Sequence, residues 1–152
     1  MSPADQLAAE TAALRSLLAL LRQEQRLLGA GDAEGHACLL EDKASQIAEL
    51  SQLANDRHQA LGSLGFAASE AGMQHWLAQS TEVTRARWQA LMAVARDAHE
   101  ANRVNGLLLG QLQLRNRQAL AALGLGASSG LYGASGQAEL TLASARAAVV
   151  TG

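Results

Sequence analysis

Few side chains in this sequence are spaced for catalysis or for metal binding. Its four histidines lie far apart: His36, His58, His75 and His99. None belongs to an H-x-x-x-H or E-x-x-H pair, the spacings that place two zinc or iron ligands on one helix face. Glu34, His36 and Cys38 are closer together, but a two-residue spacing spreads them around a helix. We therefore expect no metal site and no cofactor.

A glycine-rich stretch at 124–130, with the sequence GLGASSG, superficially resembles a phosphate-binding loop. It lacks a lysine, does not match G-x-G-x-x-G, and follows a predicted helix rather than a strand. We interpret it as a linker. A nucleophilic serine or cysteine would also need a base and a group to orient that base, and the sequence suggests neither. The chain is therefore not expected to be an enzyme.

The dominant element is a predicted helix over about 81–123, roughly 40 residues or about 60 Å long. At ~100° per residue, its apolar residues gather on one stripe. These residues are Val83, Ala90, Leu91, Val94, Ala98, Ala101, Leu108, Leu109, Leu112, Ala119 and Leu123. Asn105 and Asn116 lie in the same stripe. A single helix cannot bury such a stripe alone, so other helices must lie along it.

Three further helices are predicted, over about 3–28, 33–61 and 70–79. The leucines of the first recur every seven residues, a coiled-coil-like pattern: Leu7, Leu14, Leu21 and Leu28. Ser2 and Asp32 are suited to cap the first and second helices, and Ser80-Thr81 the long helix, because their side-chain oxygens accept hydrogen bonds from the first free N–H groups. Glycines at 29 and 31 end the first helix.

The second helix is predicted to turn one apolar face inward, made of Leu40, Ala44, Ile47, Leu50, Ala54 and Leu61. Its charged residues, Lys43 and Arg57 among them, are expected to lie mostly outside. A short loop between helices of similar length predicts an antiparallel hairpin. The expected fold is all-α: an elongated antiparallel bundle of three main helices and one short helix over residues 1–123. A flexible, glycine-rich C-terminal tail is expected over 124–152.

Composition excludes several classes of partner. The chain has 152 residues, a formal net charge of −2, a pI near 6.1 and 3% aromatic residues. This balance does not favour nucleic acid or anionic membranes, and so few aromatic rings provide no base-stacking platform. The apolar run at 104–114 is too short to span a bilayer, and no signal peptide is evident. Cys38, the single cysteine, fits a reducing compartment. We expect a cytoplasmic protein.

Leu107 and Leu114 lie one heptad apart on the face of the long helix opposite its stripe. Either the hairpin wraps around and covers them, or they form an exposed apolar strip for a partner or a second copy. The long helix should exceed the other two by some 20 Å. Unburied apolar length of that size indicates an interface.

Asn102, Asn105 and Gly106 interrupt the apolar pattern at the middle of the long helix. A polar residue in a helix seam fixes register or oligomeric state at some cost in stability. The amide of Asn105 is more readily explained by a bond to a carbonyl or water than by direct ligand contact. Gly106 and Gly110 lie four residues apart, a spacing that allows another helix backbone to come close, although a kink at Gly106 stays open.

Two motifs resemble the flagellar export chaperones of the FlgN type. The first is N-R-V-N-G at 102–106, followed by three leucines in a long helix, and the second is L-Y-G-A-S-G at 131–136 in a glycine-rich tail. The layout of the whole chain is similar to that family. The resemblance implies a cytosolic chaperone that binds the C-terminal helices of hook-associated junction proteins. It would keep them unassembled and deliver them to the flagellar type III export gate and its ATPase complex.

The resemblance places cargo contact at the end of the long helix and in the tail. The apolar candidates there are Leu107, Leu114, Leu120, Leu123, Leu125, Leu140 and Leu142. The tail tyrosine of the family, implicated in docking to the export gate, corresponds to Tyr132, with Gly133 and Gly136 beside it. The alternative is a structural coiled-coil module that dimerises and takes no transient cargo. A weak homodimer is compatible with the chaperone as well.

Overall fold

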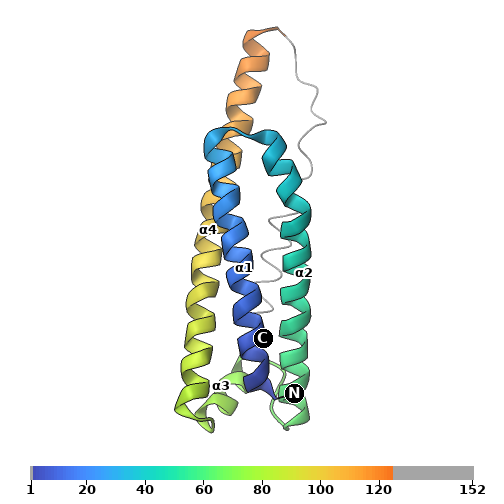
Figure 1. Cartoon of the computed structure of the whole chain (residues 1–152), viewed down its shortest axis with the longest axis vertical. Helices are drawn as coiled ribbons and strands as arrows, with labels where there is room; N and C mark the ends of the chain where they lie inside the picture. Colours follow the sequence, from blue (N-terminus) through green and yellow to red (C-terminus); the bar gives the residue numbers. More distant parts are fainter. Residues whose placement is uncertain (1, 125–152) are drawn as a thin grey trace.

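The computed structural model describes residues 2–124, and in them every regular element is a helix. The order is α1 (Pro3–Ala30), α2 (Ala33–Ser63), α3 (Glu70–Ala78) and α4 (Glu82–Ala122) (Figure 1). The prediction of an all-helical bundle with three main helices and one short helix is confirmed. The tail expected over 124–152 lies, apart from Gly124, outside the described residues.

The predicted caps begin and end the helices. Ser2 and Asp5 form a reciprocal capping box at the start of α1. The side chains of Asp32 and Thr81 accept hydrogen bonds from backbone N–H groups in the first turns of α2 and α4. Gly31 ends α1 in the left-handed conformation, with φ of 69°, which glycine adopts without steric cost. These local signals explain why the boundaries follow so closely from sequence.

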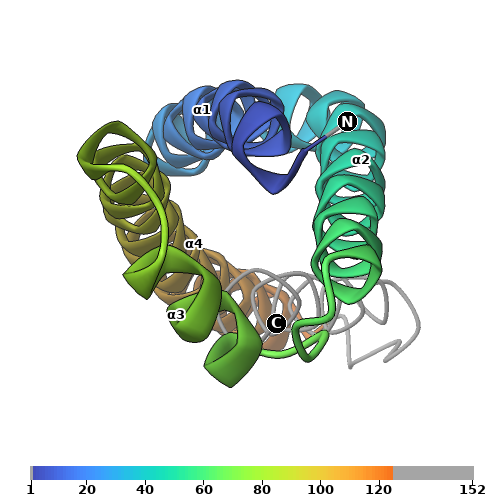
Figure 2. The same ribbon diagram turned by 90° about the horizontal axis from the view of Figure 1, so that it is seen from below.

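Helix α1 lies in the middle of the bundle and packs against both α2 and α4. It is antiparallel to α2, as the hairpin prediction requires, whereas α4 runs in the same direction as α1 (Figure 1). Viewed along the bundle, α1 lies between α2 and α4, which face each other across it (Figure 2). Side chains fill part of the space between them, since the guanidinium of Arg57 on α2 lies 5.1 Å from the ring centre of Trp88 on α4.

The predicted inner face of α2 is partly wrong. Ile47, Leu50, Ala54 and Leu61 are buried as expected, but Ala44 is exposed and Leu40 is half-buried. The buried positions at that end are instead Leu39 and Lys43, so the inner face is rotated by about one residue. Arg57 is also buried, against the expectation that both cations lie outside. Both are buried because carboxylates of α1 meet them there.

The face that α4 buries is narrower than the predicted stripe. Its buried residues recur as a heptad: Thr84, Leu91, Ala98 and Asn105, with Trp88 between the first two. Val83 and Ala90 are exposed, because each precedes a heptad position by one residue and points about 100° away from the seam. Ala119 and Leu123 are exposed as well, near the end of α4.

Gly72 and Gly110 differ in the space around them. A Cβ at Gly72 on α3 would collide with the backbone carbonyl oxygen of Ala67. A Cβ at Gly110 on α4 would meet no atom of the described residues within 4 Å. The expectation that Gly110 lets another helix come close is therefore wrong within the described part of the chain. Helix α4 runs without interruption through Gly106.

Gly72→Ala is expected to lower the free energy of unfolding by about 1–3 kcal/mol, because a methyl group there must displace backbone. Gly110→Ala, the matched control, should raise it by about 1 kcal/mol, the helix-propensity gain of alanine over glycine. Urea denaturation followed by circular dichroism measures both. Equal effects of the two substitutions would contradict the close approach at Gly72.

Candidate functional site

The C-terminal end of α4 projects beyond the hairpin (Figure 1). Asn105 contacts Leu21 and Glu24 of α1, which sets the alignment of the two parallel helices. Because both helices rise by ~1.5 Å per residue, the end of α1 at Ala30 lies level with about residue 114 of α4. The last two turns or so of α4 therefore lack a helical neighbour in the described part of the chain.

Four large apolar side chains are exposed along the C-terminal half of α4 and at Leu123, which caps its end. The exposed fractions are 57% for Leu107, 55% for Leu114, 42% for Leu120 and 72% for Leu123. Of the two alternatives for Leu107 and Leu114, exposure is the observed one, since the hairpin does not cover them. The surface predicted to contact a partner is thus open in the described residues.

These leucines belong to two different faces of α4. Leu120 and Leu123 lie within about 40° of Asn116, on the line that Leu109 and Asn105 follow inside the bundle. They continue the packing seam past the end of its neighbour, and we name them the seam extension. Leu107 and Leu114 lie on the opposite side of α4, about 160–180° away, and we name them the outer pair.

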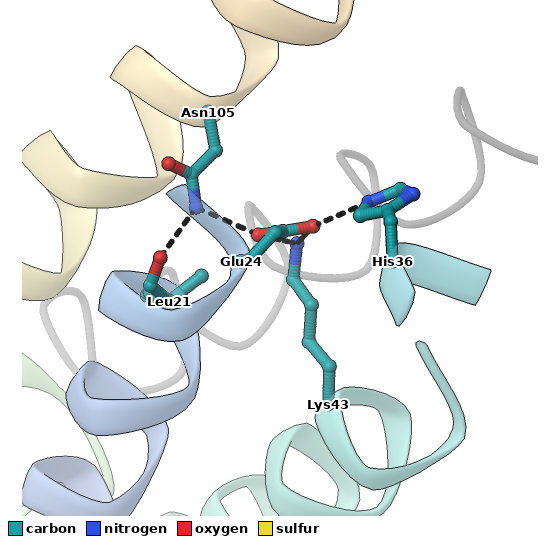
Figure 3. A network of polar contacts seen from close by, with 5 residues as sticks. All are labelled: Leu21, Glu24, His36, Lys43 and Asn105. Atoms are coloured by element: carbon teal, nitrogen blue, oxygen red, sulfur yellow. Dashed lines mark hydrogen bonds and ion pairs between the residues drawn. The ribbon is translucent and has the colours of Figure 1, made fainter. Parts of the chain in front are cut away.

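A buried polar layer ties the seam to the hairpin just below this projecting end (Figure 3). The side chain of Glu24 on α1 accepts hydrogen bonds from Lys43 on α2 at 3.0 and 3.2 Å and from Asn105 on α4 at 2.7 Å. His36 Nε2 lies 3.0 Å from the same carboxylate. Asn105 Nδ2 also donates to the backbone carbonyl of Leu21 at 2.8 Å. We call Glu24, His36, Lys43 and Asn105 the polar layer.

The polar layer can position α4, because its bonds form at one alignment of α1, α2 and α4 only. Sliding α4 by one turn would leave Glu24 and Asn105 buried without each other, which costs free energy. The amide of Asn105 bonds to a backbone carbonyl, as expected from the sequence. That Asn105 fixes the register of the helices stays a prediction. Asn102 and Gly106 are half-buried beside it. Asn116 lies on the exposed end of α4.

Electrostatics keep Glu24 ionised. Burial alone would raise the pKa of its carboxyl group, but the charge of Lys43 and the hydrogen bonds from Asn105, Lys43 and His36 together lower the pKa below its ordinary value of 4.5. A carboxylate with a lowered pKa stabilises the fold at pH values above its unfolded pKa. This contribution is lost as the pH falls through the folded pKa.

The free energy of unfolding is therefore expected to fall below about pH 4.5, as Glu24 becomes protonated. Glu24→Gln should remove this part of the acid dependence and give a shallower fall between pH 5 and 3. Denaturant unfolding at a series of pH values measures it, with Glu41→Gln, an exposed acid of α2, as the matched control. An unchanged slope in Glu24→Gln would show that another group controls acid stability.

A second buried pair lies at the other end of the bundle. Arg57 Nε donates to Glu10 Oε1 at 2.8 Å, and both side chains are 0% exposed. Burial raises the pKa of Glu10 even though Arg57 stands beside it. Neither this pair nor the Glu24–Lys43 pair was expected from the sequence. The available signal was that Glu10 and Glu24 fall on the heptad face of α1, where a buried acid requires a basic partner.

Other kinds of site are not found in the part of the chain that the structure describes. Over residues 2–124, no three His, Cys, Asp or Glu side chains gather closely enough to hold a metal ion. Within the same residues, no helix is long and apolar enough to cross a membrane. The remaining predicted site residues lie outside the described range: Leu125, Tyr132, Gly133, Gly136, Leu140 and Leu142.

The fold and this surface define a class: a small all-helical bundle whose longest helix projects past its neighbours with leucines exposed. The model of the FlgN protein family matches residues 1–140. The flagella synthesis protein FlgN of Yersinia enterocolitica is 33% identical over 128 residues, covering 83% of this chain and 82% of the relative. The protein of the same name from a serotype O:8 strain matches equally well. No solved structure matches the chain.

The chain therefore belongs to the FlgN family of flagella synthesis proteins. This is a family of flagellar chaperones and not a family of enzymes. Of the motif residues that carry the resemblance to the family, Asn105 lies in the polar layer. Tyr132 lies outside the described residues.

Proposed function

We propose that this protein is a cytoplasmic export chaperone for flagellar hook-associated junction proteins. It binds their C-terminal helices before export, keeps the subunits unassembled, and delivers them to the type III export gate and its ATPase complex. The observation that carries the proposal is the C-terminal part of α4, where four leucines from Leu107 to Leu123 are exposed in a chain of the FlgN family. An exposed apolar strip on a helix is the surface that a second amphipathic helix covers.

The mechanism requires binding and release alone. A junction protein whose terminal helices pack only after assembly carries apolar surface that would associate too early. When the chaperone covers the apolar surface of the junction protein, it stabilises the unassembled form by mass action. In this proposal Leu107, Leu114, Leu120 and Leu123 contact the cargo, together with tail residues Leu125, Leu140 and Leu142. Tyr132, with Gly133 and Gly136, contacts the export gate.

Light scattering after size exclusion tests the proposal with the C-terminal segment of a hook-associated protein. The wild-type chain should form a stoichiometric complex. The variant with Leu107→Asp, Leu114→Asp, Leu120→Asp and Leu123→Asp should lose it while keeping its helicity. Leu64→Asp with Val83→Asp is the control. These two apolar side chains are also exposed, by 55% for Leu64 and 62% for Val83, but they lie away from the projecting end.

The alternative function, a structural coiled-coil dimer, is favoured by one observation. The seam of α4 continues as Leu120 and Leu123 beyond its neighbour, as a dimerising heptad face would. Such a protein should show a constant dimer mass over a wide concentration range and ignore the cargo segment. That outcome would contradict the chaperone proposal.

A further inference from the structure

Charge is unevenly distributed along α4. Beyond Glu100 the helix contains three arginines, at 103, 115 and 117, and no aspartate or glutamate. Arg103 is paired with Glu100, with Nη2 and Oε1 2.7 Å apart. Arg115 and Arg117 are exposed, and no ion pair within residues 2–124 engages them. The projecting end of α4 is thus basic, although the chain has a formal net charge of −2.

The two arginines flank the seam extension. Asn116 lies at the middle of the line formed by Leu109, Leu120 and Leu123. Arg115 and Arg117 precede and follow Asn116 directly, so they lie about 100° to either side of it. Paired helices place charged residues in this arrangement, where the residues bordering an apolar seam select the partner by charge. The outer pair lies on the other side of α4, away from the apolar line between these arginines.

From this geometry we infer that the seam extension binds an amphipathic helix of the partner that carries acidic residues along both borders of its apolar stripe. The inference rests on the proposed function. It specifies the charge of the cargo helix and the face of α4 that binds it. Within that surface, Leu120 and Leu123 contact the apolar stripe of the acidic helix, and Arg115 and Arg117 face its two acidic borders.

Two other occupants fit the charge less well. A second copy of this chain would bring its own Arg115 and Arg117 against the same basic border, and like charges in these positions repel. Residues 125–152 of the chain contain one acid, Glu139, and one cation, Arg146, and so offer no net negative charge. A foreign helix with acidic borders complements the surface.

The test uses the full chain and two synthetic helical peptides that share one leucine stripe. One peptide carries glutamate on both borders of the stripe and the other carries lysine. The wild-type chain should bind the glutamate peptide about tenfold more tightly, equivalent to ~1.4 kcal/mol. Arg115→Glu with Arg117→Glu should reverse this preference. Raising the salt from 50 to 500 mM should weaken the wild-type complex with the glutamate peptide, because exposed charges are screened.

Matched variants locate the effect. Arg15→Glu with Arg22→Glu makes the same charge change at exposed positions of α1 and should keep the wild-type preference. Leu120→Asp with Leu123→Asp should abolish peptide binding, whereas Leu64→Asp with Val83→Asp, at exposed positions away from the projecting end, should leave it unchanged. Circular dichroism confirms the helicity of each variant. Equal binding of the two peptides, or peptide binding that survives Leu120→Asp with Leu123→Asp, would overturn the inference.

The same titrations with a hook-associated C-terminal segment separate this inference from the proposed function. Binding of that segment with no response to Arg115 and Arg117 reversal overturns the acidic-helix inference and leaves the chaperone function standing. Binding of the glutamate peptide without any binding of the segment does the reverse. A stable dimer that Leu120→Asp with Leu123→Asp dissociates would assign the surface to a second copy and overturn the inference.

Discussion

Replacement of Arg57 by methionine is expected to lower the free energy of unfolding by about 3–5 kcal/mol, the usual effect of removing one partner of a buried ion pair. Glu10 and Arg57 are both completely buried, so the carboxylate would lose its counter-ion without gaining water. The guanidinium also lies over the ring of Trp88, and this contact between α2 and α4 would be weakened as well. The loss is a large fraction of the stability of a small domain.

Denaturant unfolding of Arg57→Met, of Glu10→Leu and of the double variant measures this effect. The double variant should be more stable than Arg57→Met, because no charge is left buried alone. Within the described residues, Arg57 Nη1 and Nη2 and Glu10 Oε2 have no hydrogen-bond partner, so an apolar pair loses little. Arg96→Met, at an exposed position of α4, is the control. A double variant as unstable as Arg57→Met would show that shape rather than charge controls this site.

Lys43→Met is the second substitution with a large expected effect, about 3 kcal/mol at pH 7. It removes the cation that offsets the burial of Glu24, so the pKa of Glu24 should rise and the folded state should favour the protonated carboxyl group. The destabilisation is therefore greatest near neutral pH. It should shrink below about pH 4.5, where Glu24 is increasingly protonated in the unfolded state too.

A double-mutant cycle with Glu24→Gln isolates the pair. We expect a coupling energy of about 1–3 kcal/mol between positions 24 and 43 at pH 7, typical of residues in one buried network. Asn105 and His36 are unchanged in every variant, so the cycle measures the interaction between Glu24 and Lys43 only. Additive effects at positions 24 and 43 would contradict the role of Lys43 in holding Glu24 ionised.

Local signals made most of the fold predictable from the sequence. Ser2, Asp32 and Thr81 cap their helices through side chains a few residues from their targets, so no tertiary information is needed to place those boundaries. The heptad leucines of α1 predicted its buried face for the same reason. The buried Lys43 and Arg57 could not be placed from the pattern of α2 alone, because their partners lie on another helix.

The candidate site was predictable in part. Length and helical periodicity indicated that α4 exceeds its neighbours and that Leu107 and Leu114 lie off the seam. Whether the hairpin covered them depended on which helices flank α1, a tertiary fact that one sequence does not contain. Asn105 was identified as a seam residue, but its partner Glu24 lies 81 residues away in the sequence. The roles of the exposed leucines stay predictions for the binding experiments.

The polar layer divides α4 into two segments of unequal local stability. Below it, α4 packs against α1, so its backbone amide hydrogens are expected to exchange with the unfolding of the whole bundle. Beyond the end of α1, the last turns of α4 have no helical neighbour within residues 2–124, and a helix end without neighbours frays rapidly in water. Amide exchange should accordingly accelerate from Asn105 towards Ala122. A partner that captures the fraying end must order it, so part of the contact energy is consumed and the complex dissociates faster than its contact area suggests.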